Sequence, residues 1–201
     1  MTDCFALLNE PRRPWLDPEA LKVKFLKLAA AAHPDKQPGL SEAERGPANR
    51  RYAELNAACN CLAEPKSRLR HLLELELGAK PEDVQQIPAA LADAFAEVAT
   101  ICRNADAFLA EKSKATSPLL QVRLFERAQD WIERLKGLQK KLNELREKLT
   151  DELKSLDEKW TTAGAASHGE LLPKLEELYR LFGYFNRWDS QIQERVVQLT
   201  L

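Results

Sequence analysis

Residues 18–35 read PEALKVKFLKLAAAAHPD, an amphipathic helical pattern that ends in the tripeptide His33-Pro34-Asp35. Asp17 can cap the N-terminus of this helix, and Pro18 occupies the first helical position, where no backbone N–H is needed. Apolar residues recur every three or four positions, at Leu21, Phe25, Leu28 and Ala32. The basic residues fall largely on the other faces, at Lys22, Lys24 and Lys27. We therefore expect a helix with one apolar face and a basic outer surface.

Helix-breaking residues divide the rest of the N-terminal part. A proline disfavours helical geometry in the residue before it, so the helix should stop at His33. The breakers that follow predict an exposed loop from residue 33 to Pro47. A second helix should continue from that loop to Pro65, and a short third one should end near Gly78. A brief apolar turn around Phe5 precedes them all.

From Pro88 to the end the pattern is helical, with two interruptions at residues 113–118 and 161–169. The middle of the resulting three long helices carries an apolar seam at Leu135, Leu138, Leu142, Leu145, Leu149, Leu153, Leu156 and Trp160. We favour packing of this seam within the chain over a coiled-coil dimer, because the helices on either side also have apolar faces. We predict an all-α protein with an N-terminal domain over residues 1–78, a linker over 79–87 and a three-helix bundle over 88–201.

Charge and hydropathy exclude several classes of partner. The 201 residues include 30 basic and 31 acidic side chains, for a net charge of -1, which argues against a nucleic-acid partner and against a membrane surface. No run of about 18 apolar residues could span a bilayer, and the N-terminus lacks a basic stretch followed by an apolar core. We therefore expect a cytoplasmic protein with no membrane partner.

Residues that could bind a metal or take part in catalysis are few and scattered. The cysteines Cys4, Cys59, Cys61 and Cys102 form no Cys-x-x-Cys pair and have no histidine at zinc-finger spacing, so we expect no metal. We regard them as small buried apolar residues or as residues without a role. An enzyme that used His33 and Asp35 as acid and base, with His71 or His168, has little support, because no phosphate loop or nucleophile elbow accompanies them. We predict no catalytic residue and no cofactor.

The tripeptide His33-Pro34-Asp35 after a basic helix resembles the signature of J-domains. The resemblance extends to Phe5-Ala6-Leu7-Leu8, Leu16-Asp17, Phe25-Leu26-Lys27-Leu28, Leu55-Asn56-Ala57-Ala58, Leu62, Pro65 and Arg68. J-domains are binding modules, in which a helical hairpin with this loop docks on a DnaK-type chaperone and stimulates its ATPase. The resemblance implies that the chaperone-binding residues are His33, Pro34, Asp35, Lys22, Lys24, Lys27 and Lys36.

The whole chain is most similar to the HscB-type co-chaperones of iron–sulfur cluster assembly. It has no Gly/Phe-rich linker and no cysteine repeats, and the run Leu69-Arg70-His71-Leu72-Leu73-Glu74-Leu75 before Gly78 resembles the exit helix of that type. The resemblance implies a DnaK/HscA-type chaperone as one partner and an iron–sulfur cluster scaffold protein as the other.

A scaffold-binding face is implied on the first helix of the bundle. The residues that would form it are Leu91, Asp93, Phe95, Glu97 and Val98. A simpler alternative is that Leu91, Phe95 and Val98 belong to the core of the bundle. Two further alternatives remain open. In the first, the bundle binds a different client. In the second, the chain is a structural or nucleic-acid-binding helical protein, which only the leucine seam and Arg50-Arg51 favour. We expect a monomer, with self-association through the long helices as the alternative.

Overall fold

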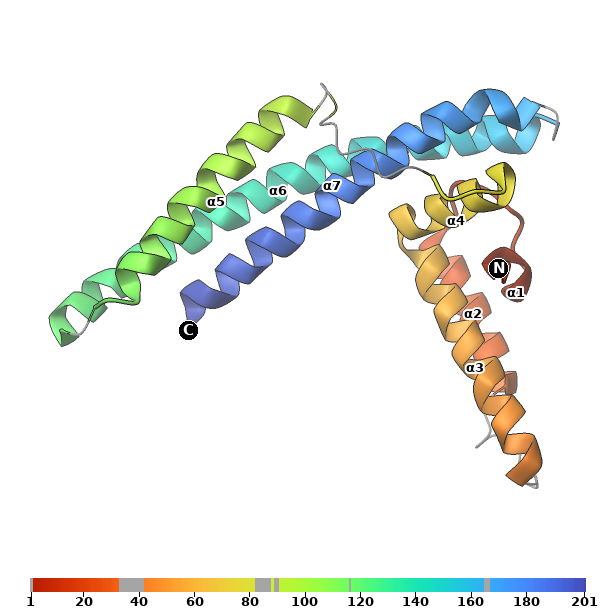
Figure 1. Cartoon of the computed structure of the whole chain (residues 1–201), viewed down its shortest axis with the longest axis horizontal. Helices are drawn as coiled ribbons and strands as arrows, with labels where there is room; N and C mark the ends of the chain where they lie inside the picture. Colours follow the sequence, from red (N-terminus) through yellow and green to blue (C-terminus); the bar gives the residue numbers. More distant parts are fainter. Residues whose placement is uncertain (1, 33–41, 82–87, 89–90, 116, 165–166) are drawn as a thin grey trace. The chain divides into compact units, whose positions relative to one another are not determined.

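The structure is a computed structural model that describes residues 2–32, 42–81, 88, 91–115, 117–164 and 167–201, without the side chains of residues 42–44 and 118. These residues form seven α-helices and no strand, which confirms the all-α prediction (Figure 1). The helices are α1 (Cys4–Leu7), α2 (Pro18–Ala32), α3 (Glu42–Ala63), α4 (Pro65–Leu77), α5 (Ala92–Lys112), α6 (Pro118–Thr162) and α7 (His168–Thr200). Within the described part of the chain, no helix combines the length and the apolar character needed to cross a membrane.

Local capping explains where α2 and α4 begin and where α4 ends. The Ala20 N–H donates a 2.8 Å hydrogen bond to Asp17 Oδ1, so the predicted cap of α2 is confirmed. The Glu64 carboxylate caps α4 in the same way, accepting from the N–H groups of Lys66 and Ser67 at 3.0 and 2.6 Å. Helix α4 ends at Gly78, whose φ of 68° lies in the left-handed region that favours glycine.

The predicted loop from residue 33 to Pro47 is wrong in its second part. Helix α3 already begins at Glu42, and Pro47 lies inside it. A proline in the second turn removes one backbone hydrogen bond and crowds the carbonyl four residues earlier, but it leaves the later turns intact. The acidic residue types at positions 42 and 44 suit the positive end of a helix dipole. Pro47 therefore does not prevent the helix from starting before it. Residues 33–41 lie outside the described part.

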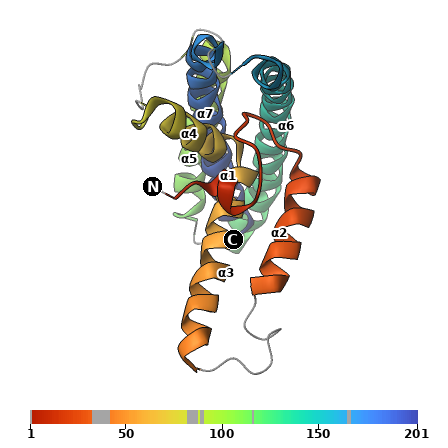
Figure 2. The same cartoon turned by 90° about the vertical axis from the view of Figure 1, so that its right-hand side faces the viewer.

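Helices α2 and α3 lie side by side and antiparallel, as the predicted hairpin requires (Figure 2). Helices α1 and α4 both pack against α3. The interior of these four helices is apolar and includes Phe5, Leu8, Leu16, Leu21, Leu55, Leu62, Leu69, Leu72 and Leu73, all buried. Of the four residues predicted for the apolar face of α2, Leu21 is buried, whereas Phe25, Leu28 and Ala32 are half-buried.

By internal contacts the chain forms two compact units. One comprises residues 1–83 and 151–180, and the other comprises residues 84–150 and 181–201. Helices α6 and α7 therefore each contribute one part to each unit. Most of the seam from Leu135 to Trp160 is buried by the chain itself, with Leu145 and Leu149 only half-buried. Burial within one chain is what the intramolecular alternative predicts for this seam.

The segment between α1 and α2 is fastened to α6 by one buried carboxylate. Asp157 is 2% exposed, and both of its oxygens accept hydrogen bonds from the Arg13 guanidinium. Its Oδ1 also accepts the Trp15 N–H at 3.0 Å. Because water cannot replace these donors at a buried site, Asp157 fixes the path of the chain into α2.

Two further side chains hold the same segment by its carbonyl groups. The Trp160 indole donates a 3.0 Å hydrogen bond to the Arg12 carbonyl. The buried Arg68 guanidinium donates to the carbonyls of Pro14 at 2.7 Å and Leu62 at 2.5 Å. Burial lowers the pKa of Arg68 to about 10, which still leaves it charged at neutral pH. A segment without regular structure thus has its buried polar backbone groups paired.

Replacing Asp157 with alanine should lower the free energy of unfolding by about 3 kcal/mol, because the substitution leaves the Arg13 guanidinium and the Trp15 N–H without their acceptor. Urea unfolding followed by circular dichroism measures this change. Asp151→Ala is the matched control, since that side chain is 72% exposed and pairs only with Lys154. Its cost should stay below about 0.5 kcal/mol. Equal losses in the two variants would contradict the role given to Asp157.

Candidate functional site

The basic surface of α2 is present in the structure, and its three lysines differ in their surroundings. The side chains of Lys22 and Lys27 are exposed, and no described residue forms an ion pair with either. The Lys24 side chain contacts the segment before α2. Its Nζ lies 2.7 Å from Glu10 Oε1 and donates to the Asn9 carbonyl at 2.9 Å. Lys22 and Lys27 are therefore the two lysine charges of this face that remain available to a partner.

The other half of the hairpin, α3, carries three arginines and three glutamates, so it adds no net charge. Arg45 and Arg50 on α3 are exposed, and Arg51 lies 3.7 Å from Glu54 in a solvent-exposed pair that contributes little. The predicted residues His33, Pro34, Asp35 and Lys36 lie outside the described part, in the connection between Ala32 of α2 and Glu42 of α3.

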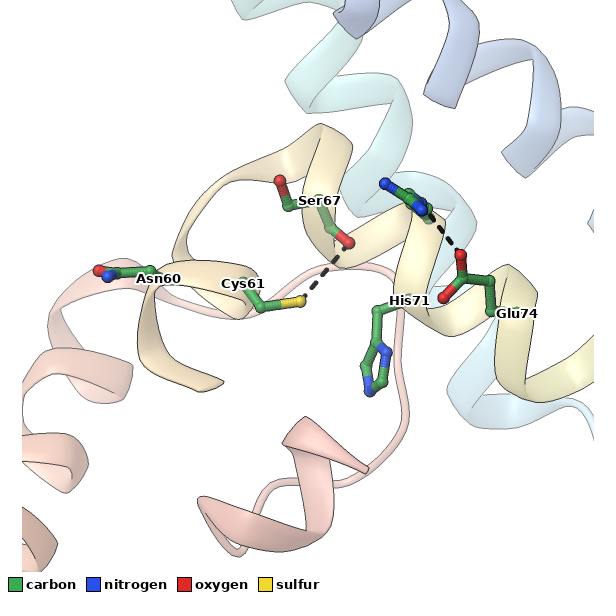
Figure 3. Close-up of a pocket in the computed structure, with 6 residues that line it drawn as sticks. Asn60, Cys61, Ser67, His71 and Glu74 are labelled. Atoms are coloured by element: carbon green, nitrogen blue, oxygen red, sulfur yellow. Dashed lines mark hydrogen bonds and ion pairs between the residues drawn. The ribbon is translucent and has the colours of Figure 1, made fainter. Parts of the chain in front are cut away.

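A pocket of about 350 Å³ lies where α3 meets α4. Its lining comprises Asn60, Cys61, Ser67, Arg70, His71 and Glu74 (Figure 3). The Cys61 thiol donates to the Ser67 carbonyl at 3.7 Å, and the Arg70 guanidinium donates to Glu74 at 3.0 Å. Sequence analysis did not predict this pocket, because its residues come together only when α3 and α4 pack.

His71 is fixed in one orientation at the edge of this pocket. The Cys4 N–H donates a 3.0 Å hydrogen bond to His71 Nε2, so this nitrogen carries a lone pair and the ring proton sits on Nδ1. The ring stacks on Phe5 with 5.8 Å between centroids. Burial lowers the pKa of His71, against the opposing effect of the Asp3 and Glu74 carboxylates. The imidazole is therefore neutral at neutral pH.

Two cysteines complete a small cluster with this histidine. One donor atom from each of Cys4, Cys61 and His71 lies within 4.8 Å of the others. Burial raises the pKa of the Cys4 thiol and raises that of Cys61 to about 12. Both thiols are therefore protonated at neutral pH and are poor nucleophiles. The expectation that the cysteines are buried fits Cys102, whereas Cys4, Cys59 and Cys61 are only half-buried.

The residues predicted for scaffold binding on α5 and just before it divide into two groups. Leu91 and Val98 are buried, at 4% and 2% exposure. Phe95 is 40% exposed and Asp93 is exposed. Glu97 is half-exposed, and its carboxylate lies 2.6 Å from the Lys141 ammonium. Burial thus agrees with the core alternative for Leu91 and Val98, and leaves Phe95 and Asp93 at the surface.

Phe95 and Val98 line a second pocket, of about 260 Å³, together with residues of α7. The α7 residues are Tyr184, Arg187, Trp188 and Gln191. The Arg187 guanidinium stacks over the Tyr184 ring, 4.6 Å from its centroid. Sequence analysis missed these four residues as site residues. The apolar pattern of α7 includes Trp188, but the pattern does not indicate which neighbouring helix that residue faces.

No family model matches this sequence. Comparison with solved structures finds the crystal structure of the human co-chaperone protein HscB, with a TM-score of 0.61 and 19% identity, over 96% of this chain and 81% of the human one. The chain has the fold of the HscB co-chaperones. The chaperone HscB from Vibrio cholerae matches with a TM-score of 0.52 and 21% identity, over 94% of this chain and 99% of the other. The likeness extends over nearly the whole chain, so it includes the bundle as well as the hairpin.

Proposed function

We propose that this protein is a co-chaperone that docks on a DnaK/HscA-type chaperone and stimulates its ATPase. The observation that carries the proposal is the sequence His33-Pro34-Asp35, which follows the basic helix α2 in a chain with the HscB fold. A proline restricts its own backbone dihedral φ, and an aspartate offers acceptors to a basic group of a partner. The role requires no catalytic group in this chain.

Charge complementarity supports the assignment of α2 as the docking helix. Lys22 and Lys27 are exposed and unpaired among the described residues, so they can meet an acidic surface without first losing an internal partner. Charges of this kind mainly accelerate encounter and fix orientation. Because Lys24 forms an ion pair with Glu10, it should contribute less to chaperone binding than Lys22 and Lys27.

Replacing His33 with glutamine should abolish stimulation of the chaperone ATPase, because the loop loses its imidazole while the helices on either side remain. Single-turnover ATP hydrolysis by the purified chaperone from the same organism measures the effect. Lys136→Gln is the control, since that side chain is exposed on α6, outside the hairpin. Unchanged stimulation by His33→Gln would reject the proposal, and so would an equal loss in both variants.

Reversing the two free charges of α2, in Lys22→Glu/Lys27→Glu, should slow association with the chaperone about tenfold at low salt, with a smaller difference at high salt. Stopped-flow or surface-based binding kinetics at two salt concentrations measure this. The matched control is Lys136→Glu/Lys140→Glu, because these lysines are equally exposed but lie on α6. If the control slowed association as much, the effect would reflect net charge and not the α2 surface.

We further propose that the C-terminal bundle carries an iron–sulfur cluster scaffold protein to the chaperone. The described surface that supports this is the pocket between Phe95 of α5 and Tyr184, Arg187 and Trp188 of α7. An exposed aromatic ring beside a guanidinium is the kind of centre on which protein interfaces depend. Asp93, two residues before Phe95 in the sequence, is also exposed.

Phe95→Ser should weaken scaffold binding about tenfold, because it removes the exposed ring at the centre of this surface. Isothermal titration with the purified scaffold protein measures the affinity. Phe125→Ser is the matched control, since Phe125 is 62% exposed on α6 and lies outside the pocket. A chain that stimulates the chaperone but does not bind the scaffold would favour the alternative, a J-domain protein whose bundle binds a different client.

A further inference from the structure

We propose that Cys4, Cys61 and His71 form a binding site for one borderline-soft divalent cation, of which Zn²⁺ is the representative to test. The three residues come from α1, α3 and α4, and they are the one such group of three found in the described part of the chain. The proposal does not depend on the chaperone function.

The spacing of the three donor atoms suits a tetrahedral ion. They lie within 4.8 Å of one another, whereas ligands at zinc–sulfur distance are about 3.8 Å apart in a tetrahedral site. The difference is about 1 Å, which side-chain torsions can close while the helices stay in place. The pair Phe5 and His71 stacks across the same contact, so α1 is already held against α4.

The donor chemistry also fits this class of ion. Two thiols and one imidazole are the ligand set that zinc prefers. The His71 ring is neutral, and its Nε2 lone pair points at α1, where it now accepts the Cys4 N–H. On binding, the two thiol protons leave to water, two metal–sulfur bonds form, and the Cys4 N–H is released from Nε2. The ion supplies the positive charge that two thiolates need at this half-buried place.

Asp3 is close to the site but already engaged. Its Oδ1 lies 3.9 Å from His71 Nε2, and it accepts the Phe5 N–H at 2.9 Å as the cap of α1. Its Oδ2 accepts from Arg12 at 2.9 Å. We therefore assign the fourth coordination position to a water molecule. Cys61 and His71 also line the pocket between α3 and α4 (Figure 3), and we expect both that water and the ion to enter from it.

Titration of the reduced full-length chain with Zn²⁺, in competition with a chromophoric chelator, tests the proposal. We expect one ion per chain with a dissociation constant below about 1 µM. Cys4→Ser and Cys61→Ser should each weaken binding about 100-fold or more, since each removes a ligand. Cys59→Ser is the matched control, because Cys59 is half-buried on the same helix but outside the cluster, and it should bind as the unaltered chain does.

A second measurement uses the unaltered protein and does not require any variant to fold. Zn²⁺ should protect two of the four thiols from alkylation, and peptide mapping should assign the protection to Cys4 and Cys61. Co²⁺ in place of Zn²⁺ should give thiolate-to-metal charge-transfer absorption. Failure of the reduced chain to bind Zn²⁺ would overturn the proposal, as would equal protection of Cys59 or Cys102. Formation of a Cys4–Cys61 disulfide without any metal binding would overturn it as well.

Discussion

The buried carboxylate of Asp157 is the constraint on which the N-terminal half depends. It accepts from Arg13 and from the Trp15 backbone, and so decides where the segment before α2 can run. A buried ion pair contributes little net stability, because desolvation of both charges offsets their attraction. Its effect is on specificity. A chain path that moved Arg13 away would leave a negative charge without donors in an apolar interior.

The parts of the fold that follow from local rules were predictable from the sequence. Capping by Asp17 and the break at Pro65 depend on neighbouring residues only, and they mark helix boundaries in the structure. The start of α3 was missed because Pro47 was interpreted as the end of the loop, whereas the helix includes this proline in its second turn. Local signals thus predicted that the helices exist more accurately than they predicted where the helices end.

Contacts between distant parts of the chain were beyond sequence reasoning. The Cys4 N–H and His71 Nε2 are 67 positions apart, and Arg13 and Asp157 are 144 apart, so no spacing rule connects either pair. Helical periodicity put Phe95 and Val98 on α5 but could not tell which of them the bundle would cover. That choice depends on where α7 packs, and Tyr184 and Trp188 line the same pocket. For a candidate surface made by two helices, the sequence therefore predicted the residues of one helix and not those of the other.

The division of α6 and α7 between the two compact units has a consequence for modularity. Residues 1–83 share their unit with residues 151–180, which include Asp157 and Trp160. A fragment cut after the hairpin would lack the acceptor for Arg13 and the indole that holds Arg12. Modules that recombine freely are usually those whose interior is encoded in one continuous stretch. Here the interior of the first unit comes from two segments that are distant in the sequence. Transfer of the hairpin to another protein therefore requires transfer of both segments.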